Sequence, residues 1–249
     1  MSAPKADSYR SGTDDCVKRF LVIVFALMLS ACQINDVNAP VTNAGDRSKY
    51  HIVRKGDTLY SIAWKYGRDY KSLARANKIA APYIIFVGQK LSIRGVRSAP
   101  ASSTSKPKKR VAKSPAKSGA PVPLNSNLNW QWPLRGEILK GFSLAGKVNK
   151  GINIAAKAGT GIRAAADGVV VYAGGNLRGY GKLVIVKHNN HYLSAYGNNR
   201  TIRVKEGAQV KSGQVLAEVG SSNAKVEMLH FEIRKDGKPV NPIRYLPSL

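Results

Sequence analysis

Hydrophobic residues divide the chain into three stretches with different patterns. Residues 20–29, FLVIVFALML, form one continuous apolar run. Residues 50–94 carry apolar positions three or four residues apart, a spacing that favours amphipathic helices. From residue 130 onward, short apolar segments alternate with glycine-centred turns, which is typical of β-strands. The pattern therefore predicts an apolar leader, a small helix-containing module and a larger β domain.

The middle stretch predicts two helices between two short strands. A strand is expected over residues 50–53, and Thr58 then fits the N-cap position of a first helix that Gly67 ends. A second helix is expected over residues 70–77, followed by a returning strand over residues 88–93. These elements give a small α+β module in βααβ order.

The C-terminal stretch, residues 130–249, predicts a compact, mainly antiparallel β domain with little helix. In the segment VKEGAQVKSGQVLAEVG, hairpin turns are expected at Gly207, Gly213 and Gly220. The residues between these turns that supply the apolar faces are Val204, Val210, Val215 and Val219.

Two segments have the composition of connectors. Residues 32–49 are polar and rich in turn-forming residues, so they are predicted to be a tether. Residues 95–129 contain mostly Pro, Ala, Ser and Lys with few large apolar residues, so we expect them to be disordered and extended. The predicted fold is therefore multidomain, with a disordered basic linker between the module and the β domain.

The charge of the chain limits its partners. Its 249 residues include 40 Lys and Arg against 14 Asp and Glu, a formal net charge of +26. Such a chain favours anionic partners, which include nucleic acid, acidic membrane surfaces and peptidoglycan. The sequence has no RNA-binding signature, helix-turn-helix or zinc-finger motif, so we do not expect a nucleic-acid partner.

The apolar run at residues 20–29 predicts export. Lys18 and Arg19 precede it, and its length suits the core of a signal peptide but is too short for a bilayer span. It ends in LSAC, where a small residue precedes Cys32, and this end resembles the bacterial lipobox. The resemblance implies removal of residues 1–31 as a signal peptide and lipidation of Cys32. The alternatives are an uncleaved anchor and an ordinary signal peptide.

The residue after Cys32 bears on the destination of the chain. In lipoproteins of this kind an Asp at that position favours inner-membrane retention. Gln33 therefore implies the outer membrane, with the chain facing the periplasm of a Gram-negative bacterium. Cys16 would leave with the signal peptide and Cys32 would carry lipid, so the mature chain would have no thiol available for a disulfide.

The module resembles the LysM family in both of its signature segments. VRKGDTLYSI matches the family's opening, and NKI followed by VGQKLSI matches its close. LysM modules bind glycans that contain N-acetylglucosamine, so the resemblance implies binding to peptidoglycan. In this family the glycan groove lies between two loops, which carries over to Gly56, Asp57, Thr58, Leu59, Ile84, Ile85, Phe86 and Val87. The alternative for Leu59 and Ile85 is a purely structural place in the core.

The C-terminal domain resembles the lysostaphin/LytM-type peptidases, whose fold is mainly antiparallel β of the duplicated hybrid motif type. The matching segments include GINIAA, AAADGVVVYAG, LHFEIR and GKPVNP. Active members hold a zinc ion through His, Asp and His ligands and leave a fourth position for water. Two further His residues orient the water and stabilise the oxyanion that develops.

Four of these five reactive positions hold a different residue type in this chain. The first two ligand positions fall on Asn149 and Asn153 of KVNKGINIAA, and the two catalytic His positions fall on Asn198 and Met228. Only His230 keeps the type that the family requires. The sequence therefore predicts a pseudo-peptidase with no catalytic residues, no bound metal and no cofactor.

The other His residues do not replace the missing ligands. His188 and His191 lie three residues apart on a predicted strand and turn, outside the ligand positions, and His51 belongs to the LysM module. His230 by itself is better explained as a hydrogen-bonded residue of the β core.

The order of lipobox, LysM module, basic linker and LytM-type domain resembles that of the murein hydrolase activators. In that family the vacant groove binds a periplasmic N-acetylmuramoyl-L-alanine amidase and draws an autoinhibitory helix away from its zinc, a population shift through differential binding. The resemblance implies a partner groove formed by Asn149, Asn153, Tyr180, Tyr196, Asn198, Met228 and His230.

The leading prediction is a non-enzymatic amidase activator that promotes hydrolysis of septal peptidoglycan and separation of daughter cells. Its partners would be peptidoglycan, the amidase and, through the lipid anchor, the outer membrane, with enrichment at the septum. The first alternative is a lipoprotein that binds peptidoglycan and activates nothing. The second is a zinc endopeptidase of peptidoglycan with unusual ligands.

Overall fold

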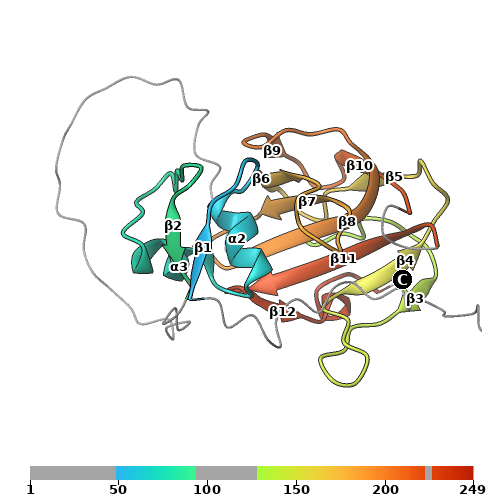
Figure 1. The fold of residues 1–249 in the computed structure, drawn as a ribbon. Helices are drawn as coiled ribbons and strands as arrows, with labels where there is room; N and C mark the ends of the chain where they lie inside the picture. The colour runs from blue at the N-terminus through green and yellow to red at the C-terminus, as the bar shows by residue number, and fades with distance from the viewer. Residues whose placement is uncertain (1–48, 94–127, 222–225, 249) are drawn as a thin grey trace, which may run out of the picture. The chain divides into compact units, whose positions relative to one another are not determined.

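The structure is a computed structural model that describes residues 49–93, 128–221 and 226–248 (Figure 1). The predicted signal peptide, Cys32 and nearly all of the predicted tether and linker lie outside the described residues. Within the described part of the chain, no helix has the length and apolar character needed to cross a membrane.

The LysM module has the predicted βααβ order. Its four elements are β1 (Tyr50–Ile52), α2 (Leu59–Lys65), α3 (Tyr70–Ala76) and β2 (Lys90–Ser92). The two strands pair antiparallel, with His51 opposite Leu91.

Short polar side chains cap the N-termini of both helices of the module. The Thr58 hydroxyl accepts a hydrogen bond from the Ser61 backbone N–H at 3.0 Å, and the Thr58 N–H donates to Ser61 Oγ at 2.9 Å. This reciprocal capping box satisfies two donors that the helix geometry leaves free. Asp69 caps α3 in the same way by accepting from the Ser72 N–H at 2.8 Å.

The C-terminal domain is built on antiparallel strands, as the sequence predicts. Its elements are β3 (Ile138–Lys140), β4 (Ile152–Ala155), β5 (Gly161–Arg163), β6 (Gly168–Gly174), β7 (Lys182–Lys187), β8 (Tyr192–Ile202), β9 (Gln209–Val210), β10 (Val215–Val219), β11 (Met228–Lys235), β12 (Lys238–Val240) and the 3-10 turn η1 (Pro242–Arg244). The main sheet has the order β3-β4-β11-β8-β7-β6-β9, so β11 lies between β4 and β8 (Figure 1). Strand β10 pairs with β5 and β8, and β12 pairs with β11.

Strand β11 separates two environments through its alternating side chains. Leu229, Phe231 and Ile233 join one hydrophobic core, in which Phe231 packs against Tyr196. The side chains between them point to the opposite face because successive residues of a strand alternate. That face carries Met228, His230, Glu232 and Arg234 in a row.

The predicted glycine turns are partly confirmed. Gly207 and Gly213 adopt left-handed φ angles of +82° and +80°, which tight turns favour in glycine. Gly220 differs, because it follows β10 and bridges to Met228 without a left-handed φ. A Cβ atom there would lie 2.6 Å from the Arg200 backbone nitrogen, so close backbone approach explains this glycine.

The second hydrophobic core is shared between the LysM module and the main sheet. From the module it contains α2 residues such as Leu59 and Trp64, and from the sheet it contains Leu183, Ile185 and Ala195. Both parts fall in one compact unit of the chain, and α2 contacts β6. The sheet face that carries His230 therefore continues into the surface on which the module packs.

Candidate functional site

Two of the three positions that match the family's zinc ligands lie on the neighbouring strands β4 and β11. Asn153 lies directly opposite His230 in the antiparallel register, and the two side chains are buried. His230 Nδ1 is 2.7 Å from Asn153 Oδ1, and His230 Nε2 is 3.1 Å from Glu232 Oε1. Both ring nitrogens thus already have oxygen partners within the protein.

This donor set does not fit the zinc ion that the fold family implies. Catalytic zinc needs three nitrogen, sulfur or carboxylate ligands, and two of the family's three ligand positions hold the neutral amides Asn149 and Asn153, which leaves His230 as the single imidazole. A metal at His230 would have to displace Asn153 or Glu232 from the ring. Within the described residues, His, Cys, Asp and Glu form no group of three suited to a metal ion.

The remaining predicted positions border this pair. Asn149 is buried, and its Nδ2 donates to the carbonyl oxygen atoms of Lys140 at 3.3 Å and Gly141 at 2.9 Å, which closes the turn after β3. Met228 points to the same face of β11 as His230 and is also buried. Asn198 is buried with a left-handed φ of 64°, and its N–H donates to the Tyr180 carbonyl at 2.7 Å.

One of the two predicted tyrosines, Tyr196, lies away from the sheet face that carries His230. Tyr196 is opposite Phe231 in the register and lies in the first hydrophobic core, on the other face of the sheet from His230. Its hydroxyl accepts from the Ala165 N–H at 2.8 Å, so Tyr196 does not share the sheet face of the predicted partner groove. Tyr180 belongs to a turn between β6 and β7. Its hydroxyl donates to Glu232 Oε1 at 2.7 Å.

Sequence reasoning missed the next two residues of the row. Glu232 and Arg234 are fully buried, and Arg234 Nε donates to Glu232 Oε2 at 3.0 Å. Burial alone would raise the pKa of Glu232. The Arg234 guanidinium and the hydrogen bonds from His230 and Tyr180 instead lower this pKa to about 2. The period-two pattern of LHFEIR carries the signal, because it places His230, Glu232 and Arg234 on one face.

Arg234 connects this row to the LysM module. Its guanidinium carbon lies 3.6 Å from the centre of the Trp64 ring, and its Nη1 donates to the Trp64 carbonyl at 2.7 Å. A chain of contacts therefore runs from Trp64 through Arg234, Glu232 and His230 to Asn153.

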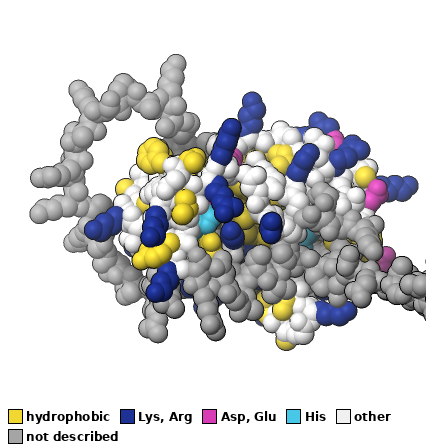
Figure 2. All heavy atoms as spheres, viewed as in Figure 1, with side chains coloured by type: hydrophobic (Ala, Val, Ile, Leu, Met, Phe, Trp, Pro, Cys, Tyr) yellow, Lys and Arg dark blue, Asp and Glu magenta, His cyan; other side chains and the backbone are white. Residues whose placement is uncertain are grey.

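The predicted glycan residues divide into an exposed group and a buried or engaged group. Ile84, Phe86 and Val87 are 61%, 70% and 71% exposed, which leaves three large apolar side chains open to a ligand. Hydrophobic side chains gather on the module in Figure 2. Leu59 is buried in the shared core, and Ile85 packs against it while partly buried, which favours the structural alternative for Leu59.

The loop between β1 and α2 is engaged with other parts of the protein. Asp57 accepts hydrogen bonds from the Arg54 N–H at 2.9 Å and pairs with His51 Nε2 at 2.8 Å. The Thr58 hydroxyl donates to the Val171 carbonyl of β6 at 3.2 Å. A Cβ atom on Gly56 would lie 2.3 Å from Asn176 Nδ2, so the loop fits closely against the sheet domain.

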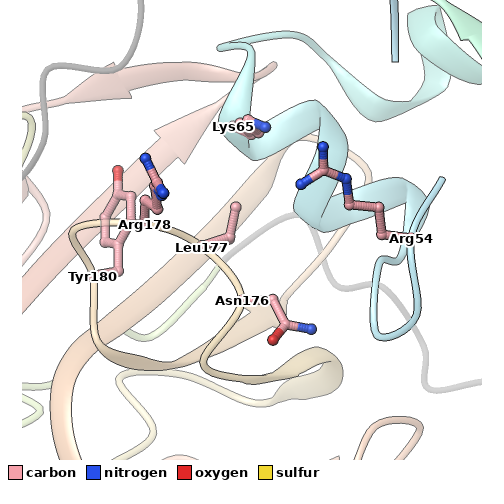
Figure 3. Close-up of a pocket in the computed structure, with 6 residues that line it drawn as sticks. All are labelled: Arg54, Lys65, Asn176, Leu177, Arg178 and Tyr180. Carbon is pink, nitrogen blue, oxygen red and sulfur yellow. The ribbon is translucent and has the colours of Figure 1, made fainter. Parts of the chain in front are cut away.

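A basic pocket of about 430 Å³ lies where this loop meets the β6–β7 loop (Figure 3). Figure 2 shows that Lys and Arg are spread over the face it displays, with few acidic side chains. Three cations and no carboxylate contribute to the pocket among the described residues. Its lining consists of Arg54, Lys65, Asn176, Leu177, Arg178 and Tyr180.

The other two His residues of the sheet domain have partners other than the Asn153–His230 pair. His188 is buried, with Nδ1 2.8 Å from the Asp167 carbonyl oxygen and Nε2 2.7 Å from Ser194 Oγ. Burial lowers its pKa to about 4, so the ring is neutral at physiological pH. His191 pairs with Asp236 at 2.8 Å on the surface.

Comparison with known proteins places both domains in characterised families. Residues 51–94 match the LysM domain, and residues 147–242 match Peptidase family M23. The chain is 46% identical to a protein of Pseudomonas aeruginosa named lipoprotein NlpD/LppB homolog, over 80% of this chain and 77% of that protein. It is 38% identical to the uncharacterized lipoprotein YgeR of Escherichia coli, over 91% of each chain. It is 37% identical to the murein hydrolase activator NlpD of Escherichia coli, over 80% of this chain and 68% of that protein.

Proposed function

Because the chain belongs to the NlpD/LppB family of lipoproteins, we propose that it activates periplasmic N-acetylmuramoyl-L-alanine amidases and does not itself cleave peptidoglycan. The observation that carries the proposal is the donor set on β4 and β11. Asn153 and His230 stand opposite each other in the antiparallel register, but two of the three ligand positions hold the amides Asn149 and Asn153, and a catalytic His position holds the thioether of Met228.

The partner groove is formed by Asn149, Asn153, Asn198, Met228 and His230, with Tyr180 at its edge. These side chains are buried or nearly so in the isolated chain. Amide and thioether groups suit contact with a helix of a protein partner better than they suit a metal ion, because they are neutral and adaptable. The amidase would be activated through stronger binding of the groove to its open state.

The chain acts from the outer membrane. Lipidation at Cys32 anchors it to the periplasmic side, the LysM module holds it to peptidoglycan, and activation promotes septal hydrolysis and separation of daughter cells. The exposed side chains of Ile84, Phe86 and Val87 support the glycan contact, because apolar surface packs against the faces of sugar rings.

A dye-release assay tests the activity directly. Purified full-length protein, a cognate amidase and dye-labelled sacculi are combined in all pairwise mixtures. We expect no release by the protein alone, slow release by the amidase alone and clearly faster release by both together. Asn198→Trp, which places a large ring in the groove, should abolish the stimulation, whereas Leu144→Trp at an exposed position is the matched control.

Each other outcome of this assay supports a different function. Release by the protein alone would support the zinc endopeptidase. Full sacculus binding without stimulation of any amidase of the host would support the structural lipoprotein, which the exposed apolar side chains of the module also fit.

A further inference from the structure

The β1–α2 loop of the LysM module makes several of the module's contacts with the sheet domain. Asn176 Nδ2 donates to the Lys55 carbonyl at 3.1 Å, and the Thr58 hydroxyl donates to the Val171 carbonyl at 3.2 Å. Gly56 lies between these two contacts, and a Cβ atom on it would lie 2.3 Å from Nδ2 at the tip of the Asn176 side chain. This loop is also one of the two that form the predicted glycan groove.

We propose that this loop is a shared surface for which the sheet domain and glycan chains compete. In the docked state seen here, the sheet domain is hydrogen-bonded to the loop at the Lys55 carbonyl and at the Thr58 hydroxyl, while Lys55 and Gly56 keep exposed surface. The opposite loop, with Ile84, Phe86 and Val87, remains exposed. A glycan that must contact both loops at once therefore meets a half-covered groove until the module leaves the sheet.

The docked state is anchored by one buried cation. Arg234 stacks on the Trp64 ring and donates to the Trp64 carbonyl, while Glu232 binds it from the other side. A cation over an aromatic ring is most stabilising when both groups are shielded from water, as they are here. Glu232 remains Arg234's partner when the module leaves, so release does not strand an unpaired charge.

Charge repulsion at the edge of the same contact opposes docking of the module on the sheet domain. Arg54 and Lys65 of the module face Arg178 of the sheet domain around the basic pocket, and no carboxylate lines this pocket among the described residues (Figure 3). Like charges that meet across a contact repel each other. The contact therefore combines a strong anchor at Arg234 with repulsion at its rim, which suits an interface that opens.

Opening of the module also changes the surroundings of the partner groove. Glu232, which binds Arg234, is also the partner of His230 at the centre of that groove. Release of the module uncovers the sheet surface that continues from the groove, so glycan binding would favour access by an amidase. This last consequence rests on the proposed function, whereas competition for the loop does not.

Competition makes a quantitative prediction for glycan affinity. If only the open state binds fully, the apparent dissociation constant is the intrinsic constant divided by the open fraction. A closed state that is ten times more populated than the open state would weaken binding about tenfold. Locking the module closed should weaken it further, and forcing it open should restore the intrinsic affinity.

A reversible cross-link tests the closed state. The full chain carries Cys16→Ser and Cys32→Ser, so that the only thiols are those introduced by Lys55→Cys and Asn176→Cys, whose native backbone and side chain are in contact. The probe is a neutral oligomer of N-acetylglucosamine, because the basic linker should not attract it. Binding is measured by calorimetry before cross-linking with a short cleavable reagent, after cross-linking and after cleavage.

We expect the cross-linked protein to bind the oligomer at least about tenfold more weakly than the same protein after cleavage of the link. The two single-Cys variants, treated identically, should show no change. Equal affinity of the cross-linked and cleaved forms would overturn the proposal. This readout contains no amidase, so its failure is distinct from a failure of the proposed function.

A second variant should displace the module from the sheet domain without a substitution in the module itself. Asn176→Trp places a large ring on the sheet domain where Gly56 leaves no space, and the module's own sequence is unchanged. Asn190→Trp, at an exposed position between β7 and β8, is the matched control. We expect tighter oligomer binding by Asn176→Trp alone, and unchanged or weaker binding by this variant would contradict competition for the loop.

Discussion

The guanidinium carbon of Arg234 lies 3.6 Å from the centre of the Trp64 ring, although 170 residues separate the two in sequence. This contact joins a helix of the LysM module to a strand of the peptidase-type domain. Because Arg234 also binds Glu232, and Glu232 binds His230, the module contacts a network that reaches the positions matching the family's zinc ligands.

Removal of the Arg234 side-chain charge should destabilise the fold. Arg234→Met leaves Glu232 buried without its cation, a change that typically costs about 3 to 5 kcal/mol. Thermal or denaturant unfolding measures the loss. Arg203→Met is the control, because its ion pair with Glu218 is partly exposed and its loss should cost less than about 1 kcal/mol. An equal effect of the two substitutions would contradict the role of Arg234.

The stability of the domain should fall in acid through Glu232. Its folded pKa of about 2 lies below the ordinary value of 4.5, so the unfolded chain binds this proton more readily. The stabilisation is therefore fully present above about pH 5 and is lost as the pH falls toward 2, by about 3 kcal/mol in all. Glu232→Gln should flatten the unfolding profile between pH 5 and pH 2. His188 is held neutral in the folded protein, so its protonation in the unfolded chain also lowers the stability as the pH falls below its ordinary pKa of 6.5. This loss should be the same in the wild type and in Glu232→Gln.

Restoration of the family's zinc ligands and catalytic residues should confer zinc binding and abolish amidase activation. The combined change Asn149→His, Asn153→Asp, Asn198→His and Met228→His would provide the ligands and catalytic groups of an active peptidase. We expect metal analysis to find bound zinc in this variant and substoichiometric zinc in the wild type. The added ring volume and charge in a buried groove should abolish amidase activation. One zinc per chain in the wild type would refute the pseudo-peptidase assignment.

The exposed apolar loop should carry glycan affinity. Phe86→Ser removes a side chain that is 70% exposed, so the fold should be little affected while binding to an N-acetylglucosamine oligomer falls severalfold. Leu144→Ser, at a similarly exposed apolar position of the sheet domain, is the matched control for calorimetry. Equal binding by wild type and Phe86→Ser would place the glycan contact elsewhere.

Lipidation at Cys32 is tested in cells. Cys32→Ser should abolish labelling by a palmitate analogue and release the protein from outer-membrane fractions, because the thiol and the cleavage site are lost together. Cys16→Ser should leave both readouts unchanged. Labelling that persists in Cys32→Ser would show that Cys32 is not the lipidated residue.

The sequence by itself determined the local elements and the residue types at the positions that match the family's active site. Thr58 and Asp69 begin helices because a short oxygen-bearing side chain caps the first turn, and that preference is local. Gly207 and Gly213 mark turns for the same local reason. The amides at Asn149 and Asn153 argue against a zinc site wherever the chain places them, because ligand chemistry belongs to the residue type.

Only the tertiary structure decided which side chains meet. Tyr196 lies on the opposite sheet face from His230, because strand register sets the face of each side chain. In this register Tyr196 stands opposite Phe231, which belongs to the first hydrophobic core. Tyr180 reaches Glu232 from a turn, and Gly220 is required by the nearby Arg200 backbone. The docking of Trp64 on Arg234 and the hydrogen bonds between the β1–α2 loop and the sheet domain depend on contacts between distant segments. No local pattern encodes such contacts, because they arise when two folded surfaces bury each other's apolar and charged groups.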